Sequence, residues 1–196
     1  EMVAQHWTGK TSAVMVASPS NPTGTLMPEE SLCAIAAIAR ERGGAVIVDE
    51  IYHGLVYDGA YTPALKFSDD VFVINSFSKY FNMTGWRLGW MVVPGAYVRE
   101  LDKLSQNIYL SAPTPAQHAA LAAFTPETLA ILDERRAEFK ARRDFLVPAL
   151  RGLGFRIPLV PQGAFYIYAD CSALTGDSFA FARDLLETAG VAITPG

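Results

Sequence analysis

The sequence predicts an α/β fold built on a mostly parallel sheet. Three short apolar runs, at residues 13–18, 45–49 and 71–75, have the length and composition of buried strands. An amphipathic helix between the first two runs makes them a β-α-β unit, in which the strands are parallel and the crossover is right-handed. The chain has 196 residues, of which 51% are apolar and 18% charged, so it can form a sizeable core.

The first strand and the helix after it have clear limits in the sequence. Pro19 ends the run at 13–18, and residues 18–24 form a dense cluster of turn-forming residues. Pro28 fits the first turn of the helix, and Gly43 fits its end. The apolar stripe expected to face the sheet comprises Leu32, Ile35, Ala36 and Ala39.

A fourth apolar run at residues 88–93 completes the predicted sheet. The segment that separates it from the third run is close to the shortest possible parallel crossover. The spacing therefore leaves open whether this strand is parallel or antiparallel to its neighbour.

The pattern changes near residue 110, after which helices dominate. Helices are expected at 97–108, 115–124, 127–150 and 178–189, and strands at 163–169 and 191–193. On the long helix the apolar side is expected to carry Leu129, Leu132, Phe139 and Phe145. The outer face is expected to carry Arg135, Arg136, Arg142 and Arg143 as a solvated surface with ion pairs.

Composition excludes several classes of protein. The net charge of −4 and the pI near 5.4 argue against a nucleic-acid-binding protein. The two cysteines, Cys33 and Cys171, form no CxxC pair and are expected to be buried free thiols, and the three histidines have no metal-ligand spacing. Since no apolar stretch is long enough to span a membrane, a cytoplasmic protein is expected, with no metal and no membrane partner.

Polar residues stand where three of the predicted strands end. Asn21 follows the first strand, Asp49 closes the second, and Lys79 lies just beyond the third. In open parallel sheets, ligands bind at the carboxyl ends of the strands, so these three side chains are expected to converge on a binding site.

The segment around Lys79 has a long pattern of fixed spacing. It reads SFSKYFNMTGWRLG over residues 76–89, and the motifs SNPTG at 20–24 and DEIY at 49–52 precede it. These motifs resemble the pyridoxal-phosphate enzymes of aminotransferase class I/II, the aspartate aminotransferase superfamily of fold type I. The resemblance extends from Ala13 to Gly196. It implies a three-layer α/β/α large domain and part of a smaller α+β C-terminal domain.

The resemblance assigns a role to each motif residue. Lys79, Asp49 and Tyr52 are implied as catalytic residues: Lys79 forms a Schiff base with pyridoxal 5'-phosphate and moves protons, and Asp49 keeps the pyridine nitrogen protonated. Tyr52 and Asn21 donate to the phenolic oxygen of the cofactor. The phosphate is implied to bind Arg87 and Ser76, with Ser78 as a second hydroxyl.

Each role has a structural alternative that the residue types leave open. The alternatives are a surface charge for Lys79, a helix N-cap for Asp49, a core aromatic for Tyr52, a turn former for Asn21 and an ion pair for Arg87. Glu50 and His53, beside the second motif, are interpreted as structural residues. Phe165 and Tyr166, in the motif GAFY at 163–166, either reach the mouth of the site or pack in the core.

The resemblance also implies a domain organisation. Residues 1–110 are expected to be part of the large cofactor-binding domain, 111–150 connecting helices, and 151–196 the start of the small domain. Three family elements are not found: a glycine-rich phosphate turn and a ring-stacking aromatic, both expected before residue 1, and an arginine for the substrate carboxylate, expected after Gly196. The chain is therefore expected to be part of a longer enzyme.

Transamination between an amino acid and a 2-oxo acid, in a homodimer, is the expected function. The same motif residues also serve other reactions, such as those of a carbon–sulfur β-lyase or a cyclopropane-forming synthase. A non-enzymatic, aminotransferase-like domain of a transcription regulator is a third possibility. The motifs discriminate poorly among these functions, and they leave the amino-acid substrate open.

Overall fold

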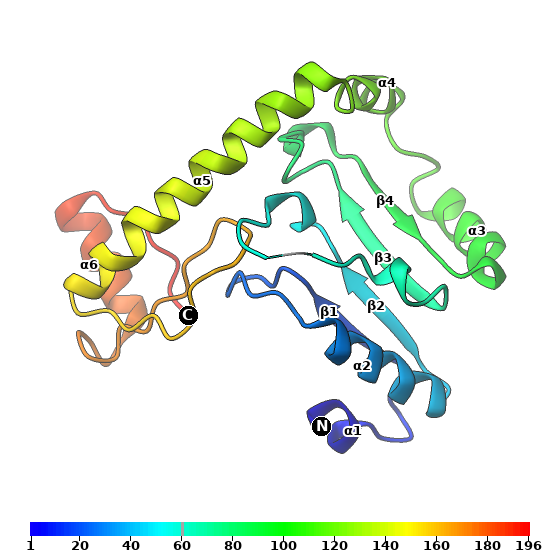
Figure 1. The fold of residues 1–196 in the computed structure, drawn as a ribbon, viewed down its shortest axis with the longest axis horizontal. Coiled ribbons are helices and arrows are strands. Elements are labelled where there is room, and N and C mark those ends of the chain that lie inside the picture. Colours follow the sequence, from blue (N-terminus) through cyan, green and yellow to red (C-terminus); the bar gives the residue numbers. More distant parts are fainter. Residues whose placement is uncertain (60) are drawn as a thin grey trace.

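A computed structural model describes residues 1–59 and 61–196, which contain a four-stranded sheet (Figure 1). The strands lie in the order β1 (Ala13–Ala17), β2 (Ala45–Asp49), β3 (Val71–Ser76) and β4 (Gly89–Val92). β1, β2 and β3 are parallel to one another, whereas β4 is antiparallel to β3. The predicted α/β class and mostly parallel sheet are confirmed. The direction of the fourth strand, which the sequence leaves undecided, is antiparallel.

The core lies between the sheet and α2 (Glu29–Glu41). Alternate residues of β2 and β3 face this helix and are buried, namely Val46, Val48, Val71 and Val73. Ala36 and Ala39 of α2 pack against them, as the apolar stripe of the helix predicts. α1 (Met2–His6) leads into Trp7, which packs in the same cluster. Each fully buried valine contributes about 1.5–3 kcal/mol to folding.

The predicted helices are confirmed within a few residues of their expected ends. They are α3 (Val98–Ile108), α4 (Thr114–Ala122), α5 (Pro126–Gly152) and α6 (Ser178–Ala189). The Thr125 hydroxyl caps α5 by accepting from the Thr128 amide at 3.3 Å, and the Asp177 carboxylate caps α6. α5 runs from α4, near the sheet, to the region around α6 (Figure 1).

Two predicted strands are wrong. In the segment 163–169, Gly163 forms an isolated antiparallel bridge with Val56, and Ala164 has a φ of +60°. This left-handed conformation interrupts the extended backbone, so the segment does not continue as a regular strand. Residues 191–193 have no strand partner in the described part of the chain and are not extended into a sheet.

Three side chains lie where the sequence pattern does not put them. Phe145, expected on the apolar side of α5, is 75% exposed, and Arg143, expected on its solvated face, is buried. Leu132 and Phe139 are buried or packed in the core as predicted, so the predicted apolar side of α5 is wrong only in its C-terminal half. Cys33 was expected to be buried but is exposed, because it lies on α2 outside the stripe that meets the sheet. None of the helices in residues 1–59 and 61–196 combines the length and hydropathy needed to cross a membrane.

Candidate active site

Asp49 is held at the centre of the sheet by the neighbouring strands. It is the last residue of β2 and pairs in register with Ala17 of β1 and Ile74 of β3. The ladder continues past it, because the Ser18 amide donates to the Asp49 carbonyl at 3.0 Å. Its carboxylate Oδ1 accepts from the Ile51 amide at 3.0 Å. The short 3-10 turn at His53–Leu55 begins only after Tyr52, so the structure does not use Asp49 as a helix N-cap.

Lys79 presents its amine above aromatic rings. Its Nζ lies 5.7 Å from the centroid of the Tyr52 ring and 5.5 Å from that of Phe165. The residue is half-buried, and its Nζ has no hydrogen-bond or ion-pair partner within residues 1–59 and 61–196. An uncommitted amine between two rings at a sheet edge differs from the exposed lysines Lys10 and Lys66, which match their surface interpretation.

Tyr52 joins the carboxyl ends of β1 and β2. Its side chain is only 3% exposed, and its hydroxyl lies 2.6 Å from the hydroxyl of Tyr166. Asn21 Nδ2 donates to the same Tyr166 hydroxyl at 3.5 Å. Burial, the Tyr166 hydroxyl and the Asp49 charge raise the pKa of Tyr52 above its ordinary value. Tyr52 therefore keeps its proton at neutral pH and remains a hydrogen-bond donor.

A second set of polar side chains lies in the connection between β3 and β4. The Ser76 hydroxyl donates to the Ser78 hydroxyl at 2.8 Å and accepts from the Ser78 amide at 3.0 Å. The Thr84 hydroxyl donates to the Ser78 carbonyl at 2.6 Å, which ties the two sides of the loop together. The serine hydroxyls and Arg87 thus lie in one closed loop on either side of Lys79.

Arg87 is exposed and its guanidinium is only partly engaged. Its Nη1 donates to the Thr84 carbonyl at 2.9 Å, and its backbone has a φ of +54°. No carboxylate of the described residues forms an ion pair with it, so the alternative of a structural ion pair finds no partner there. The exposed guanidinium and the two serine hydroxyls of the same connection are donors of the kinds that bind a phosphate.

Tyr166 is the residue that sequence reasoning located only loosely. The structure brings it to Tyr52 and Asn21 from a segment more than a hundred positions away in the chain. The neighbouring ring of Phe165 also packs edge-on against Tyr52, with centroids 5.5 Å apart. The motif GAFY was the available signal, but the residue types alone did not distinguish packing from hydrogen bonding.

Glu50 and His53 have the structural roles expected of them. Glu50 is buried and its Oε1 accepts from the Ala64 amide at 2.7 Å, which holds the loop before β3. The His53 ring packs on Tyr61, with centroids 3.6 Å apart. Burial lowers the pKa of His53 to about 4, so its ring is neutral at physiological pH.

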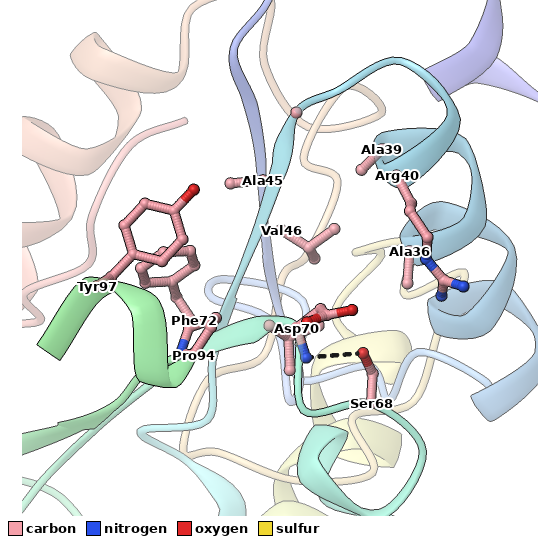
Figure 2. A pocket seen from close by; sticks show the side chains of 12 residues that line it. Ala36, Ala39, Arg40, Ala45, Val46, Ser68, Asp70, Phe72, Pro94 and Tyr97 are labelled. Atoms are coloured by element: carbon pink, nitrogen blue, oxygen red, sulfur yellow. Dashed lines mark hydrogen bonds between the residues drawn. The ribbon is translucent and has the colours of Figure 1, made fainter.

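A separate cavity of about 230 Å³ lies at the opposite end of the strands (Figure 2). It is lined by the start of β2 at Ala45, by Ala39 of α2, and by Phe72 of β3. Ligands of open parallel sheets bind at the carboxyl ends, so this cavity is not the candidate site. No cluster of three or more metal-ligating side chains occurs in the part of the chain that the structure describes.

Comparison with known proteins identifies the family. Residues 3–196 match the family described as "Aminotransferase class I and II". The chain belongs to this family. Members of this aminotransferase family depend on pyridoxal phosphate.

The relatives of this aminotransferase chain include enzymes with different printed substrates. The chain is 48% identical to the valine–pyruvate aminotransferase of Mycobacterium tuberculosis, over 93% of this chain and 48% of the relative. It is 38% identical to a probable aspartate/prephenate aminotransferase of Aquifex aeolicus, over 100% of this chain and 52% of the relative. The chain thus spans about half the length of the curated relatives it matches.

Solved structures support the same fold. A crystal structure of an aminotransferase from Mycobacterium tuberculosis matches with a TM-score of 0.95 and 45% identity, covering 100% of this chain and 51% of that one. The Thermus thermophilus aspartate aminotransferase with maleate matches with a TM-score of 0.92 and 36% identity, over 98% of this chain and 51% of that one.

The donor set of the site fits pyridoxal phosphate. An uncommitted amine, a strand-end carboxylate, a protonated phenol and a guanidinium with two hydroxyls correspond to the aldehyde, pyridine nitrogen, phenolic oxygen and phosphate of that cofactor. The fit rests on the chemistry of side chains that the structure gathers at one edge of the sheet.

Proposed function

We propose that the protein containing this chain is a pyridoxal-phosphate-dependent aminotransferase that moves an amino group between an amino acid and a 2-oxo acid. The observation that carries the proposal is the uncommitted Lys79 amine, held over the rings of Tyr52 and Phe165 at the carboxyl edge of the sheet. Relatives whose printed names are aminotransferases, at 35–48% identity, support transamination over the other reactions of the same scaffold.

When bound, pyridoxal phosphate supplies an aldehyde that condenses with amines and a ring that withdraws electrons. In this proposal Lys79 Nζ holds the cofactor covalently at the aldehyde carbon. With the group bound, the Lys79 amine would serve as the general base that accepts a substrate proton and as the acid that returns one.

The remaining site residues hold and orient the group. Asp49 keeps the ring nitrogen protonated through its negative charge, Tyr52 and Asn21 donate hydrogen bonds to the phenolic oxygen, and Arg87 with Ser76 and Ser78 binds the phosphate. Because Asp49 ends the central strand and Ser76 ends β3, both are fixed by the sheet ladder rather than by a loop. Such rigid attachment favours orientation of the reacting atoms.

The first test is the absorption spectrum of the full-length natural protein supplied with pyridoxal phosphate. We expect a band in the visible-to-near-ultraviolet range that Lys79→Ala abolishes, while Lys103→Ala, on the exposed face of α3, leaves it unchanged. Steady-state assays with an amino-acid panel and 2-oxoglutarate should then give 2-oxo acid products. Release of pyruvate and ammonia from a sulfur amino acid, without any acceptor, would instead identify a β-lyase.

Assembly, location and domain division complete the proposal. We infer a cytoplasmic homodimer in which residues 1–110 belong to the cofactor domain, 111–150 connect the domains, and 151–196 begin a smaller domain. The contact of α4 with the loop after β3, and the run of α5 away from it, support this division. Sedimentation of the active full-length protein as a monomer contradicts the dimer.

A further inference from the structure

The segment 162–166 is attached to the candidate site by its backbone. The amides of Gln162 and Gly163 donate to the Gly24 carbonyl at 2.8 and 3.0 Å, and the Ala164 amide donates to the Leu55 carbonyl at 3.0 Å. The Tyr57 hydroxyl donates to the Ala164 carbonyl. The segment is therefore bound at once to the turn after β1 and to the loop that follows Tyr52.

Ala164 changes which way the next two side chains point. In a regular strand, successive side chains point to opposite faces. After Ala164, whose backbone is left-handed, the alternation is absent: the rings of both Phe165 and Tyr166 pack edge-on against Tyr52, with centroids 5.5 and 5.6 Å away. The backbone conformation thus brings an apolar ring and a phenol to the same neighbour.

The hydroxyl of Tyr166 connects two residues that the proposed function assigns to the phenolic oxygen of the cofactor. Asn21 Nδ2 can only donate, so the Tyr166 oxygen accepts from it across 3.5 Å. A Tyr166 proton directed at the Tyr52 oxygen, 2.6 Å away, leaves the Tyr52 proton free for a further acceptor. With these directions the Tyr52 oxygen accepts the Tyr166 proton, and the phenolic oxygen of the cofactor accepts the Tyr52 proton.

We propose that Tyr166 is a positioning residue whose hydroxyl directs the Tyr52 proton toward the phenolic oxygen of the bound cofactor. The inference rests on the proposed function and adds to it a residue from beyond α5. Chains of hydrogen bonds polarise one another, so the donation from Tyr166 strengthens the donation from Tyr52. Stronger donation holds negative charge on the phenolic oxygen and lowers the proton affinity of the nitrogen that Lys79 contributes beside it.

The test is a pH titration of the visible absorption band in the cofactor-loaded, full-length protein. Tyr166→Phe keeps the ring and removes the hydroxyl, and we expect the proton affinity reported by the band to rise about threefold. Tyr52→Phe should raise it more, about tenfold or beyond. Because Tyr166 acts through Tyr52, adding Tyr166→Phe to Tyr52→Phe should produce no further rise.

Tyr168→Phe is the matched control, because it removes an exposed hydroxyl two positions further along the same segment. It should leave the titration midpoint unchanged. A Tyr166→Phe midpoint equal to that of the wild type, or an equal shift in the Tyr52→Phe background, overturns the inference alone.

A crystal structure of the loaded wild-type protein tests the same contact without any variant. Hydroxyls of Tyr52 and Tyr166 beyond hydrogen-bond distance would overturn the inference, whereas contact of Tyr52 with both Tyr166 and the phenolic oxygen supports it. Absence of any visible band from the loaded wild-type protein overturns the proposed function, and this inference with it.

Discussion

The position of the Asp49 carboxylate is fixed by its neighbours. It ends the central strand, accepts one backbone hydrogen bond from Ile51, and contributes its negative charge to the raised pKa of Tyr52. A carboxylate in this place stabilises a positive charge on a bound ring nitrogen far better than a neutral amide does. The exchange of one oxygen for nitrogen at Asp49 therefore tests the electrostatic role without changing the volume of the side chain.

We expect Asp49→Asn to lower kcat/KM of the full-length protein by about 10²–10⁴-fold, since the loss of one partner of a buried charge pair costs about 3–5 kcal/mol. Steady-state kinetics with the best amino acid of the panel measures the effect. Asp184→Asn is the control, because Asp184 is exposed on α6, far along the chain from the motif residues. Equal activity of Asp49→Asn and the wild type would contradict the assigned role.

Burial of His53 should make the free energy of unfolding depend on pH. Burial lowers its pKa from the ordinary 6.5 to about 4, so between these two pH values the unfolded chain binds a proton that the folded chain does not. The free energy of unfolding should therefore fall as the pH falls through this window and change no further below it. About a third of the side chain is exposed, so the expected loss is only about 1–2 kcal/mol.

Urea unfolding of the full-length protein at pH 7 and pH 4.5 measures this loss. His53→Gln should reduce the difference between the two pH values. His118→Gln, on the exposed side of α4, should leave the difference as it is in the wild type. A wild-type pH dependence that survives His53→Gln unchanged would assign the effect to other groups.

For individual residues, long motifs of fixed spacing predicted the candidate site better than residue types alone did. The segment 76–89 and the motif at 49–52 located the amine, the carboxylate and Tyr52, because each motif keeps its residues on one connection of the sheet. The hydrogen bond between Tyr52 and Tyr166 joins residues far apart in the chain. No local pattern encodes such a pairing, because it depends on how the segment after α5 folds back.

Among the elements, α5 depends on one buried arginine. The Arg143 side chain is 8% exposed; it pairs with Asp58 and Asp144, donates to the Pro161 carbonyl at 2.6 Å, and lies 5.3 Å from the centroid of the Tyr57 ring. These contacts tie α5 to the loop after Tyr52 and to the segment before Gly163. Arg143 thus attaches the long helix to both sides of the candidate site.

We expect Arg143→Met to lower the free energy of unfolding by about 2 kcal/mol, because the Pro161 carbonyl and the carboxylates lose their donor while the aspartates remain partly solvated. Chemical denaturation of the full-length protein measures it. Arg142→Met is a control one position away: this side chain is 69% exposed, pairs with Glu138 and lies 6.0 Å from the Phe139 ring centroid on the same helix, so about 0.5 kcal/mol or less is expected. Equal losses would mean that burial of Arg143 adds nothing.

Gly163 is required by a close approach of two chain segments. A Cβ at this position would lie 2.8 Å from the Leu55 carbonyl oxygen and 2.8 Å from Pro19 Cγ. Gly163→Ala should therefore destabilise the protein by about 2 kcal/mol and reduce the amount of cofactor it retains. Gly176→Ala, where a Cβ would contact nothing within 4 Å, should change neither quantity. Thermal unfolding and the absorbance of the purified protein provide the two measurements.

Elements were predictable where their periodicity is local. The strands of the sheet and the helices α2 to α6 follow from apolar runs, stripes and caps, and lie within a few residues of their predicted limits. The segments at 163–169 and 191–193 have strand-like composition but are not strands. Strand formation depends on a hydrogen-bonded neighbour, which composition does not supply. On α5, Leu132 and Phe139 pack as predicted, whereas Arg143 is buried because its partners Asp58 and Pro161 lie on loops distant in the sequence.

On the scale of the whole molecule, the sheet has two exposed edges. Within the residues that the structure describes, β1 and β4 each have a sheet neighbour on one side only, and β4 exposes Trp90 and Met91. Exposed strand edges and apolar patches promote association with other chains. The extent of this apolar surface predicts that residues 1–196 behave differently alone than within the full-length protein.

We expect residues 1–196, expressed alone, to bind a hydrophobic dye such as ANS and to sediment as mixed oligomers. The full-length protein at the same concentration should bind little dye and sediment as one species. Fluorescence and sedimentation velocity measure the two properties. If residues 1–196 are monomeric and bind no dye, the exposed edges of the sheet at β1 and β4 do not promote association.

The antiparallel direction of β4 has a consequence for how the protein tolerates changes in length. Because β3 and β4 form a hairpin closed by the pair Ser76 and Gly89, its loop carries both the Lys79 amine and the Arg87 guanidinium. A Cβ on Gly89 would come within 2.9 Å of the Asn75 carbonyl oxygen, so the two strands at the base of the hairpin are too closely packed for a side chain there. An inserted or deleted residue in this loop would alter the span between Lys79 and Arg87, to which the proposed function assigns the covalent attachment and the phosphate. Loop-length variation in natural sequences should therefore be confined to connections other than this one.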